Sequence, residues 1–264
     1  MGLYDSLSQI DAASHRRSDA ASAAAPAISE EERDAFYAVL RSRRSVRRFT
    51  GEPLDDKAVE RALGAALLAP NSSNLQLWQF VRVKSPTARA DLARAAMGQP
   101  AATTASEIIV CVSRPDQWQL HRDALLALLG RERVGKSVVD YYERIVPLTY
   151  RVGPMGVGGW VRSWTARLLS YLRPTPQFDG GRTYPRIVAI KSCALACENL
   201  MLALRAEGYD TCPMEGFDSR RVAKALALEG EFDIPMLIAV GKRAEGGVYG
   251  QQVRFPLGTS VRTL

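Results

Sequence analysis

The spacing of apolar residues along the chain predicts a mixture of helices and strands. The first helical stretch follows Ser29 and Glu32, which form a capping-box pattern, and it carries Phe36, Val39 and Leu40 on one face. Further helices are predicted over residues 55–69, 85–97, 115–129, 138–146, 161–172, 187–206 and 218–226. Helices are therefore expected to outnumber strands.

Short apolar runs predict the strands. They occupy residues 78–83, 107–113, 209–212 and 234–240. Strands and helices do not alternate strictly along the chain, and this order favours an α+β fold over a parallel βαβ sheet. The helix predicted over 187–206 is the longest, and its wide apolar face suits burial between other elements or against a second subunit.

Other regions carry no clear pattern. Residues 1–28 are rich in alanine, serine and aspartate and are predicted to form a mobile arm before one domain spanning 29–264. Residues 114–182 are hard to interpret, and four glycines within 153–159 predict a loop. The stretch 161–172 mixes tryptophan and leucine with arginine, which fits a membrane-surface helix or, as we favour, a cover packed on its own protein.

Composition limits the function classes without choosing among them. The 264 residues are 47% hydrophobic and 24% charged, which is ordinary for a soluble globular protein. The formal net charge of +7 and the pI near 9.4 favour anionic partners. Nucleic acid, a membrane surface and a phosphate-bearing cofactor all fit this charge, although the chain resembles no helix-turn-helix, OB-fold or zinc finger.

Cysteine and histidine usage predicts a reduced protein without a metal centre. The chain has four cysteines and two histidines, and it shows neither an export signal nor a run of about 18 apolar residues. We therefore expect a cytoplasmic protein with reduced thiols and no membrane insertion. Cys193 and Cys197 share a helix face, but no other ligand is near them in sequence, so we expect a buried apolar pair.

A basic run that begins at Arg43 reads Arg-Arg-Ser-Val-Arg-Arg-Phe. In an extended segment Arg43, Ser45 and Arg47 would share one face, and Arg44 and Arg48 would share the other. Guanidinium forks and a serine hydroxyl match the oxygens of a phosphate group. A solvated basic turn is the alternative, and the run taken alone favours it.

Two further segments carry polar groups between predicted elements. In residues 69–80, Asn74 and Gln76 each offer a donor and an acceptor that can read the edge of a heteroaromatic ring. After a predicted strand, Pro213 stiffens the backbone and Gly216 allows a ligand to approach closely. Ordinary turns are the alternative for both segments.

Taken in order, the three segments resemble the motifs of the nitroreductase family of FMN-dependent oxidoreductases. The family motif Arg-Arg-Ser-x-Arg-x-Phe is met at 43–49. The motif Ala-Pro-Ser-Ser-x-Asn-x-Gln-Pro-Trp-x-Phe is met at 69–80, with Asn71 and Leu77 in place of a serine and a proline. The third motif, Pro-x-Glu-Gly-Phe, is met at 213–217. The resemblance covers about residues 30–113 and 183–256.

The resemblance implies an FMN site. It assigns catalysis to Glu215 and Gly216, through a backbone N–H that faces flavin N5. The cofactor-binding residues that it implies are Arg43, Arg44, Ser45, Arg47, Asn71, Ser72, Ser73, Asn74, Gln76, Pro213, Met214, Glu215, Gly216, Lys242, Arg243 and Arg254.

One end of the implied phosphate site departs from the family pattern. Many members end with Lys-x-Arg on the phosphate, and here Gln252-Val253-Arg254 keeps the arginine and lacks the lysine. Lys242 and Arg243 are the candidates for the replacement charge.

The resemblance also implies an architecture. It predicts an α+β fold whose central mixed or antiparallel sheet is flanked by helices, with FMN at a homodimer interface and both subunits lining each pocket. Residues 114–182 correspond to the variable part of the family. There, Tyr141, Tyr142, Trp160 and Trp164 either close over the flavin or pack in a small core of the insert itself.

The implied activity is hydride transfer from NADH or NADPH to an electron-poor small molecule, such as a nitroaromatic or a quinone, by a ping-pong mechanism. The flavin supplies this chemistry, so no side-chain nucleophile is required. No GxGxxG segment follows a predicted strand, so a separate Rossmann nicotinamide site is not expected. The alternatives are modification of one dedicated metabolite (dehalogenation, azoline oxidation or flavin fragmentation) and flavin binding without turnover. A protein that binds nucleic acid or a membrane surface is a further class of function. The family resemblance predicts neither kind of binding.

Overall fold

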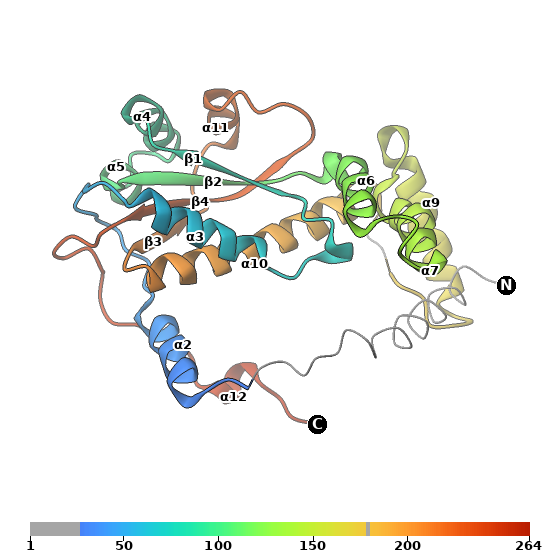
Figure 1. The fold of residues 1–264 in the computed structure, drawn as a ribbon. Helices are drawn as coiled ribbons and strands as arrows, with labels where there is room; N and C mark the ends of the chain where they lie inside the picture. The colour runs from blue at the N-terminus through green and yellow to red at the C-terminus, as the bar shows by residue number, and fades with distance from the viewer. Residues whose placement is uncertain (1–26, 178–179) are drawn as a thin grey trace.

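The computed structural model describes residues 27–177 and 180–264, and its centre is an antiparallel four-stranded sheet with helices on both faces (Figure 1). The strand order is β1-β2-β4-β3, and every neighbouring pair is antiparallel. The strands are β1 (Trp78–Val83), β2 (Glu107–Ser113), β3 (Asp210–Met214) and β4 (Asp233–Gly241). The expected α+β class is confirmed, and β3 is an edge strand of this ladder.

Helices cover the two faces of the sheet because alternate strand residues point to opposite sides. On one face lie α3 (Asp56–Leu67) and α10 (Thr183–Ala206), and on the other lie α4 (Pro86–Ala95), α5 (Pro100–Thr104) and α11 (Ser219–Ala225) (Figure 1). All seven residues of β2 are buried, which places this strand at the centre of both cores.

The insert gathers at one end of the sheet (Figure 1). Its elements are η3 (Pro115–Gln117), α6 (Trp118–Leu129), α7 (Lys136–Asp140), the π-helical turn η4 (Tyr141–Ile145), α8 (Val146–Tyr150), η5 (Pro154–Gly156) and α9 (Val157–Leu169). A third core, separate from the two that flank the sheet, lies here and includes Leu75, Trp118, Tyr142 and Tyr150. The helix predicted over 138–146 is thus three short helical pieces joined end to end.

The prediction of a loop over 153–159 is wrong, because α9 begins at Val157 and contains two of the glycines. A Cβ atom on Gly159 would lie 2.4 Å from the carbonyl oxygen of Gly181. Gly159 is therefore required because two backbone segments approach each other closely there, and not because the chain forms a flexible turn. In the described chain, Trp164 and Leu168 of α9 are exposed, so this helix does not pack its apolar stripe on its own protein as we expected.

Two helices stand away from the sheet layers (Figure 1). Helix α2 (Glu30–Ser42) has the expected capping box, in which Ser29 accepts from the Glu32 amide, yet it contains no buried residue. Helix α12 (Leu257–Ser260) lies in the C-terminal tail. The predicted arm lies almost wholly outside the described residues. The short helix η2 (Ser72–Asn74) precedes β1.

Helix α10 is the longest element, and it begins four residues before the predicted start. By length and composition alone this helix would qualify to cross a membrane, because its most apolar 18 residues have a mean hydropathy of 1.7. Half of that 18-residue stretch is buried inside the protein, because α10 packs along α3 and contacts all four strands. Its place in the core accounts for its apolar character.

Candidate active site

The arginine run lies along β3. The amide of Val46 donates to the carbonyl of Thr211 at 3.0 Å, and Ser45 pairs with Thr211 in a parallel bridge. Val46 is fully buried, whereas Ser45 and Arg47 on either side of it are exposed. The alternation expected for an extended segment is therefore present over these three residues.

A cleft of about 200 Å³ opens beside the run and is lined by Arg43, Arg44, Arg47 and Arg254. No carboxylate is among the lining residues, and the rest of the lining comes from Ser45, Val248, Tyr249, Gln251, Gln252 and Val253. The tail is attached here because Arg44 Nη2 donates to the carbonyl of Gly250 at 2.9 Å. Four arginines thus line one small concave surface, and Arg43 Nε also lies 3.9 Å from a carboxylate oxygen of Glu198.

Strict alternation assigned Arg44 to the wrong face. Alternation placed it with Arg48, whereas the family resemblance implied a cofactor-binding role, and Arg44 lines the cleft together with Arg43. Arg43 is the C-cap residue of α2, and the pairing with β3 begins only at Ser45. Strict alternation therefore does not extend back to the first two arginines, whereas Arg48 stays outside the cleft as expected.

Lys242 and Arg243 are not among the residues that line the cleft. The Lys242 ammonium lies 2.7 Å from a Glu52 carboxylate oxygen, and this hydrogen bond lowers the pKa of Glu52 and raises that of Lys242. Arg243 donates to Asp210 at 2.8 Å, and Arg205 donates to the same carboxylate at 3.2 Å. Asp210 is only 5% exposed, so Arg243 and Arg205 neutralise a buried charge.

The third motif begins in the last two residues of β3 and continues beyond the strand. Met214 forms the last pair of the ladder, with Leu237, and Glu215 and Gly216 are exposed beyond it. Gln99 Nε2 donates to the carbonyl of Gly216 at 3.0 Å and so steadies this turn. The structure therefore brings the first and third motifs to the same edge of the sheet.

An electrostatic contact supports that proximity. Burial raises the pKa of the Cys212 thiol, and the positive charge of Arg47 partly opposes the shift. Cys212 is a β3 residue one position before Pro213. Arg47 thus lies within electrostatic reach of the strand that ends in the third motif.

The second motif forms a tight loop with an unusual backbone. Ser73, Asn74 and Gln76 have φ values of 55°, 51° and 51°. Left-handed conformations cost non-glycine residues roughly 1–2 kcal/mol each, and asparagine tolerates them best. Asn71 holds the loop from within, since its Oδ1 accepts from the Gln76 amide at 2.7 Å and its Nδ2 donates to the carbonyl of Ala69.

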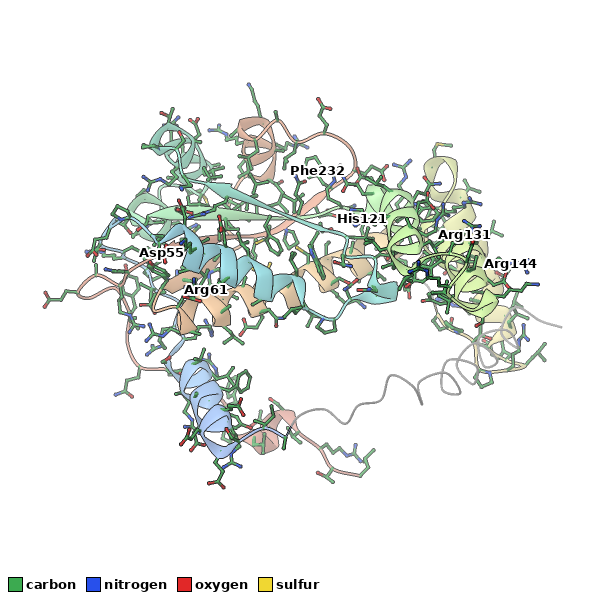
Figure 2. The ribbon with its side chains drawn as sticks, viewed as in Figure 1. Asp55, Arg61, His121, Arg131, Arg144 and Phe232 are labelled. Carbon is green, nitrogen blue, oxygen red and sulfur yellow. The ribbon has the colours of Figure 1, made fainter. Side chains whose placement is uncertain are left out.

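This loop borders a second, larger cavity of about 760 Å³ between α3, α6 and β1. Asn74 and Gln76 line it, together with His121, whose Nδ1 lies 2.8 Å from the carbonyl oxygen of Leu75. Figure 2 shows His121 where α6 approaches the end of the sheet. The two cavities share no lining residue, so one chain carries two separate groups of motif residues.

Only one of the two expected roles is seen for the aromatic residues of the insert, and only the tyrosines fill it. Tyr142 is buried in the core of the insert, and Tyr141 packs against that core. The side chains of Trp160 and Trp164 are more than half exposed, and neither residue lines the larger cavity or the arginine cleft.

The cysteines behave as apolar core residues. All four are buried free thiols, as expected for Cys193 and Cys197. The hydrogen bond between Cys193 and Cys197, with burial, raises the pKa of Cys193 far above its usual range. Within residues 27–177 and 180–264, no group of three or more histidine, cysteine, aspartate or glutamate side chains is placed to hold a metal ion.

Sequence reasoning missed several residues around the candidate site. Tyr249 and Gln252 line the arginine cleft, and Gln99 contacts the third motif. For Tyr249 and Gln252, the only signal of a role in this site was that they lie close to Arg254 in the sequence. Gln99 precedes a proline in a connection between two helices, and nothing in the sequence marks it.

Comparison with known proteins agrees with this arrangement. The Nitroreductase family model matches residues 40–242, a range that contains all three motifs. A 5,6-dimethylbenzimidazole synthase of Rhodobacter capsulatus is 37% identical over 215 residues, covering 79% of this chain and 84% of that protein. An NADH dehydrogenase of Thermus thermophilus is 29% identical over 216 residues, covering 81% and 89%.

A solved structure shows the same fold. The protein from Exiguobacterium sibiricum in complex with FMN superposes with a TM-score of 0.63 at 24% identity, covering 87% of this chain and 97% of that one. The family model spans most of the chain, and its range contains the arginine run, the strained loop and the end of β3, whereas the tail residues that complete the arginine cleft lie beyond it. The chain therefore belongs to the nitroreductase family and is a flavin oxidoreductase.

Proposed function

We propose that the protein binds FMN and transfers hydride from NADH or NADPH to an electron-poor small molecule, such as a nitroaromatic or a quinone. The observation that carries this proposal is the four-arginine cleft formed beside a segment that pairs with β3, the strand that ends in the third motif. An NADH dehydrogenase among the relatives and FMN in a structural neighbour support the choice of donor and cofactor.

The donor set of the cleft fits a phosphate monoester, which carries about −1.5 to −2 charges at neutral pH. Arg43, Arg44, Arg47 and Arg254 offer planar forks, and the Ser45 hydroxyl adds a small donor. Hydrogen bonds to charged groups contribute about 1.5–3 kcal/mol each. These residues are the ones that would hold the phosphate end of FMN.

The rest of the site would be built from backbone and amide groups. When bound, FMN supplies the hydride-accepting and hydride-donating chemistry. We assign the backbone N–H of Glu215 or Gly216 as the donor to flavin N5, because both residues are exposed directly after β3. Asn74 and Gln76 would read the ring edge. Nicotinamide and acceptor would then occupy one pocket in turn, as a ping-pong mechanism requires.

A homodimer would complete this site. In one chain the arginine cleft and the loop of the second motif belong to separate cavities, so a second copy is needed to bring a loop to each cleft. Exposed apolar side chains on α2 and α10, such as Phe36 (55%) and Leu195 (49%), are available for such an interface. We further propose a cytoplasmic location, where its buried thiols would stay reduced.

An absorbance spectrum of the purified protein tests the cofactor assignment. We expect a yellow protein with flavin bands that bleach when NADH or NADPH is added without oxygen. Reoxidation by nitroaromatic and quinone panels then identifies the acceptor class. A colourless protein that does not take up added FMN would contradict the proposal.

A second candidate is an enzyme dedicated to one metabolite. It is favoured by the 37% identity to a 5,6-dimethylbenzimidazole synthase, a higher value than the 29% identity to the NADH dehydrogenase. This candidate predicts FMN binding with poor turnover of generic acceptors. Mass spectrometry of incubations with reduced FMN in air would show 5,6-dimethylbenzimidazole if the chain shares that activity.

A further inference from the structure

Three tyrosines of the insert contact the strained loop of the second motif. The Tyr142 hydroxyl donates to the carbonyl of Ser73 at 3.0 Å. The Tyr141 hydroxyl lies 2.7 Å from the Ser73 hydroxyl, and Ser72 hydrogen-bonds the Tyr150 hydroxyl. Adjacent loop residues are therefore held by side chains 68 to 78 positions later in the sequence.

The tyrosines are themselves held rigidly. Tyr142 and Tyr150 are buried, and the Tyr150 ring stacks on Trp118 with centroids 5.8 Å apart. The Tyr141 and Tyr142 rings meet edge to face at 5.2 Å. Both belong to the π-helical turn η4, a departure from α-helical geometry that is frequent at functional sites. Packing thus fixes where the three hydroxyl groups point.

The loop needs such support because its own sequence does not favour its conformation. Ser73 has a φ of 55°, a value that serine rarely adopts, and no glycine is present in residues 71–76. Asn71 secures the far end of the loop through the Gln76 amide. The tyrosines secure the near end, at the residue where the left-handed backbone begins.

Two of the hydroxyls also remain protonated across the physiological range. Burial raises the pKa of Tyr150 well above its ordinary value and raises that of Tyr142 as well. Tyr142 therefore stays a donor to the Ser73 carbonyl at neutral pH. This behaviour suits a structural clamp better than a proton-transfer role.

We propose that Tyr141, Tyr142 and Tyr150 are positioning residues of the flavin site. They hold the loop in its left-handed conformation so that Asn74 and Gln76 are presented to the cofactor, and this role rests on the proposed function. The variable insert, which forms none of the three family motifs, would then determine how well the chain binds FMN.

The double variant Tyr141→Phe with Tyr142→Phe tests the clamp in the full-length chain. Tyr171→Phe is the matched control, because Tyr171 belongs to the same insert and is 84% exposed. Two measurements are made on each protein: the FMN dissociation constant from fluorescence titration, and hydrogen exchange of residues 71–77 without FMN. We expect the double variant to bind FMN about tenfold more weakly and to exchange about tenfold faster in the loop. The control should match the wild type in both.

A comparison of exchange in two regions separates positioning from a general loss of stability. A positioning role predicts that the double variant exchanges faster in residues 71–77 while β2, which is fully buried, exchanges as it does in the wild type. Equally faster exchange in β2 would show a general loss of stability and would overturn the clamp.

The two proposals fail in different ways. If the wild type binds FMN and the double variant matches it in affinity and exchange, the clamp is wrong. If the wild type does not bind FMN, the cofactor assignment is wrong, and faster loop exchange in the double variant would still establish that the tyrosines hold the loop.

Discussion

The amide of Val46 donates to the carbonyl of Thr211 at 3.0 Å, and this bond attaches the arginine run to the edge of the sheet. Val46 is fully buried, so the side chains next to it cannot share its direction. The bond therefore determines which arginines reach the cleft: Arg47 lines it, and Arg48 does not.

Replacing Arg47 with alanine should weaken FMN binding by about 10- to 100-fold, because a charge-assisted hydrogen bond to the phosphate is lost. The same change at Arg48 should alter the affinity by less than about twofold, since Arg48 lies outside the cleft. Fluorescence titration of the flavin measures both variants. Equal losses would contradict the placement of the run.

Arg254→Gln and Arg243→Gln should have opposite signatures. Arg254 lines the cleft, so its loss should reduce FMN affinity with little change in melting temperature. Arg243 neutralises the buried carboxylate of Asp210, so its loss should lower the free energy of unfolding by about 1–3 kcal/mol while affinity stays near wild type. Chemical denaturation and titration together distinguish them. A loss of FMN affinity in Arg243→Gln would show instead that Arg243 contributes to phosphate binding.

Leu195→Arg should disrupt the proposed dimer. Leu195 is half exposed on α10, and a buried interface would not accommodate an unpaired charge there. Sedimentation should then show a monomer with reduced FMN affinity, whereas Leu172→Arg in the insert should remain dimeric. If Leu195→Arg sediments as the wild type does, the interface lies elsewhere.

Tyr150 should make stability fall at alkaline pH. Burial raises its pKa in the folded chain above the ordinary value of 10.0. Below that value both folded and unfolded forms are neutral, so the stabilisation is complete, and above it only the unfolded chain ionises. The free energy of unfolding should decline by about 1.4 kcal/mol per pH unit above pH about 10. Denaturation between pH 8 and 11 should show a shallower decline in Tyr150→Phe, and parallel curves would contradict the assignment.

Local patterns predicted the elements that obey local rules. The Ser29 capping box, the Asp55 cap of α3 and the apolar run of β2 each specify structure through neighbouring residues, and all three are confirmed. The class of the fold followed from their order along the chain, because a sheet without βαβ alternation is antiparallel or mixed.

Long-range contacts explain what local patterns missed. The glycines of 153–159 resembled a loop, but Gly159 is needed where Gly181 approaches it, 22 positions later in the chain. Lys242 has the charge needed to bind a phosphate. Its ammonium group instead pairs with Glu52, which lies 190 positions earlier in the chain. The tyrosine contacts with Ser73 depend on how the insert folds back, and no periodicity encodes that.

One feature of α10 limits how this chain can vary. Ser192 accepts from the amide of Ser72 in the strained loop, and Arg205 donates to Ser42 just before the arginine run. The two attachments lie thirteen positions apart on a continuous helix, a span of about 20 Å. Inserting one residue between them would rotate one attachment against the other by about 100° and displace it by about 1.5 Å. Relatives that keep both attachments should therefore differ by substitution in this stretch and conserve its length.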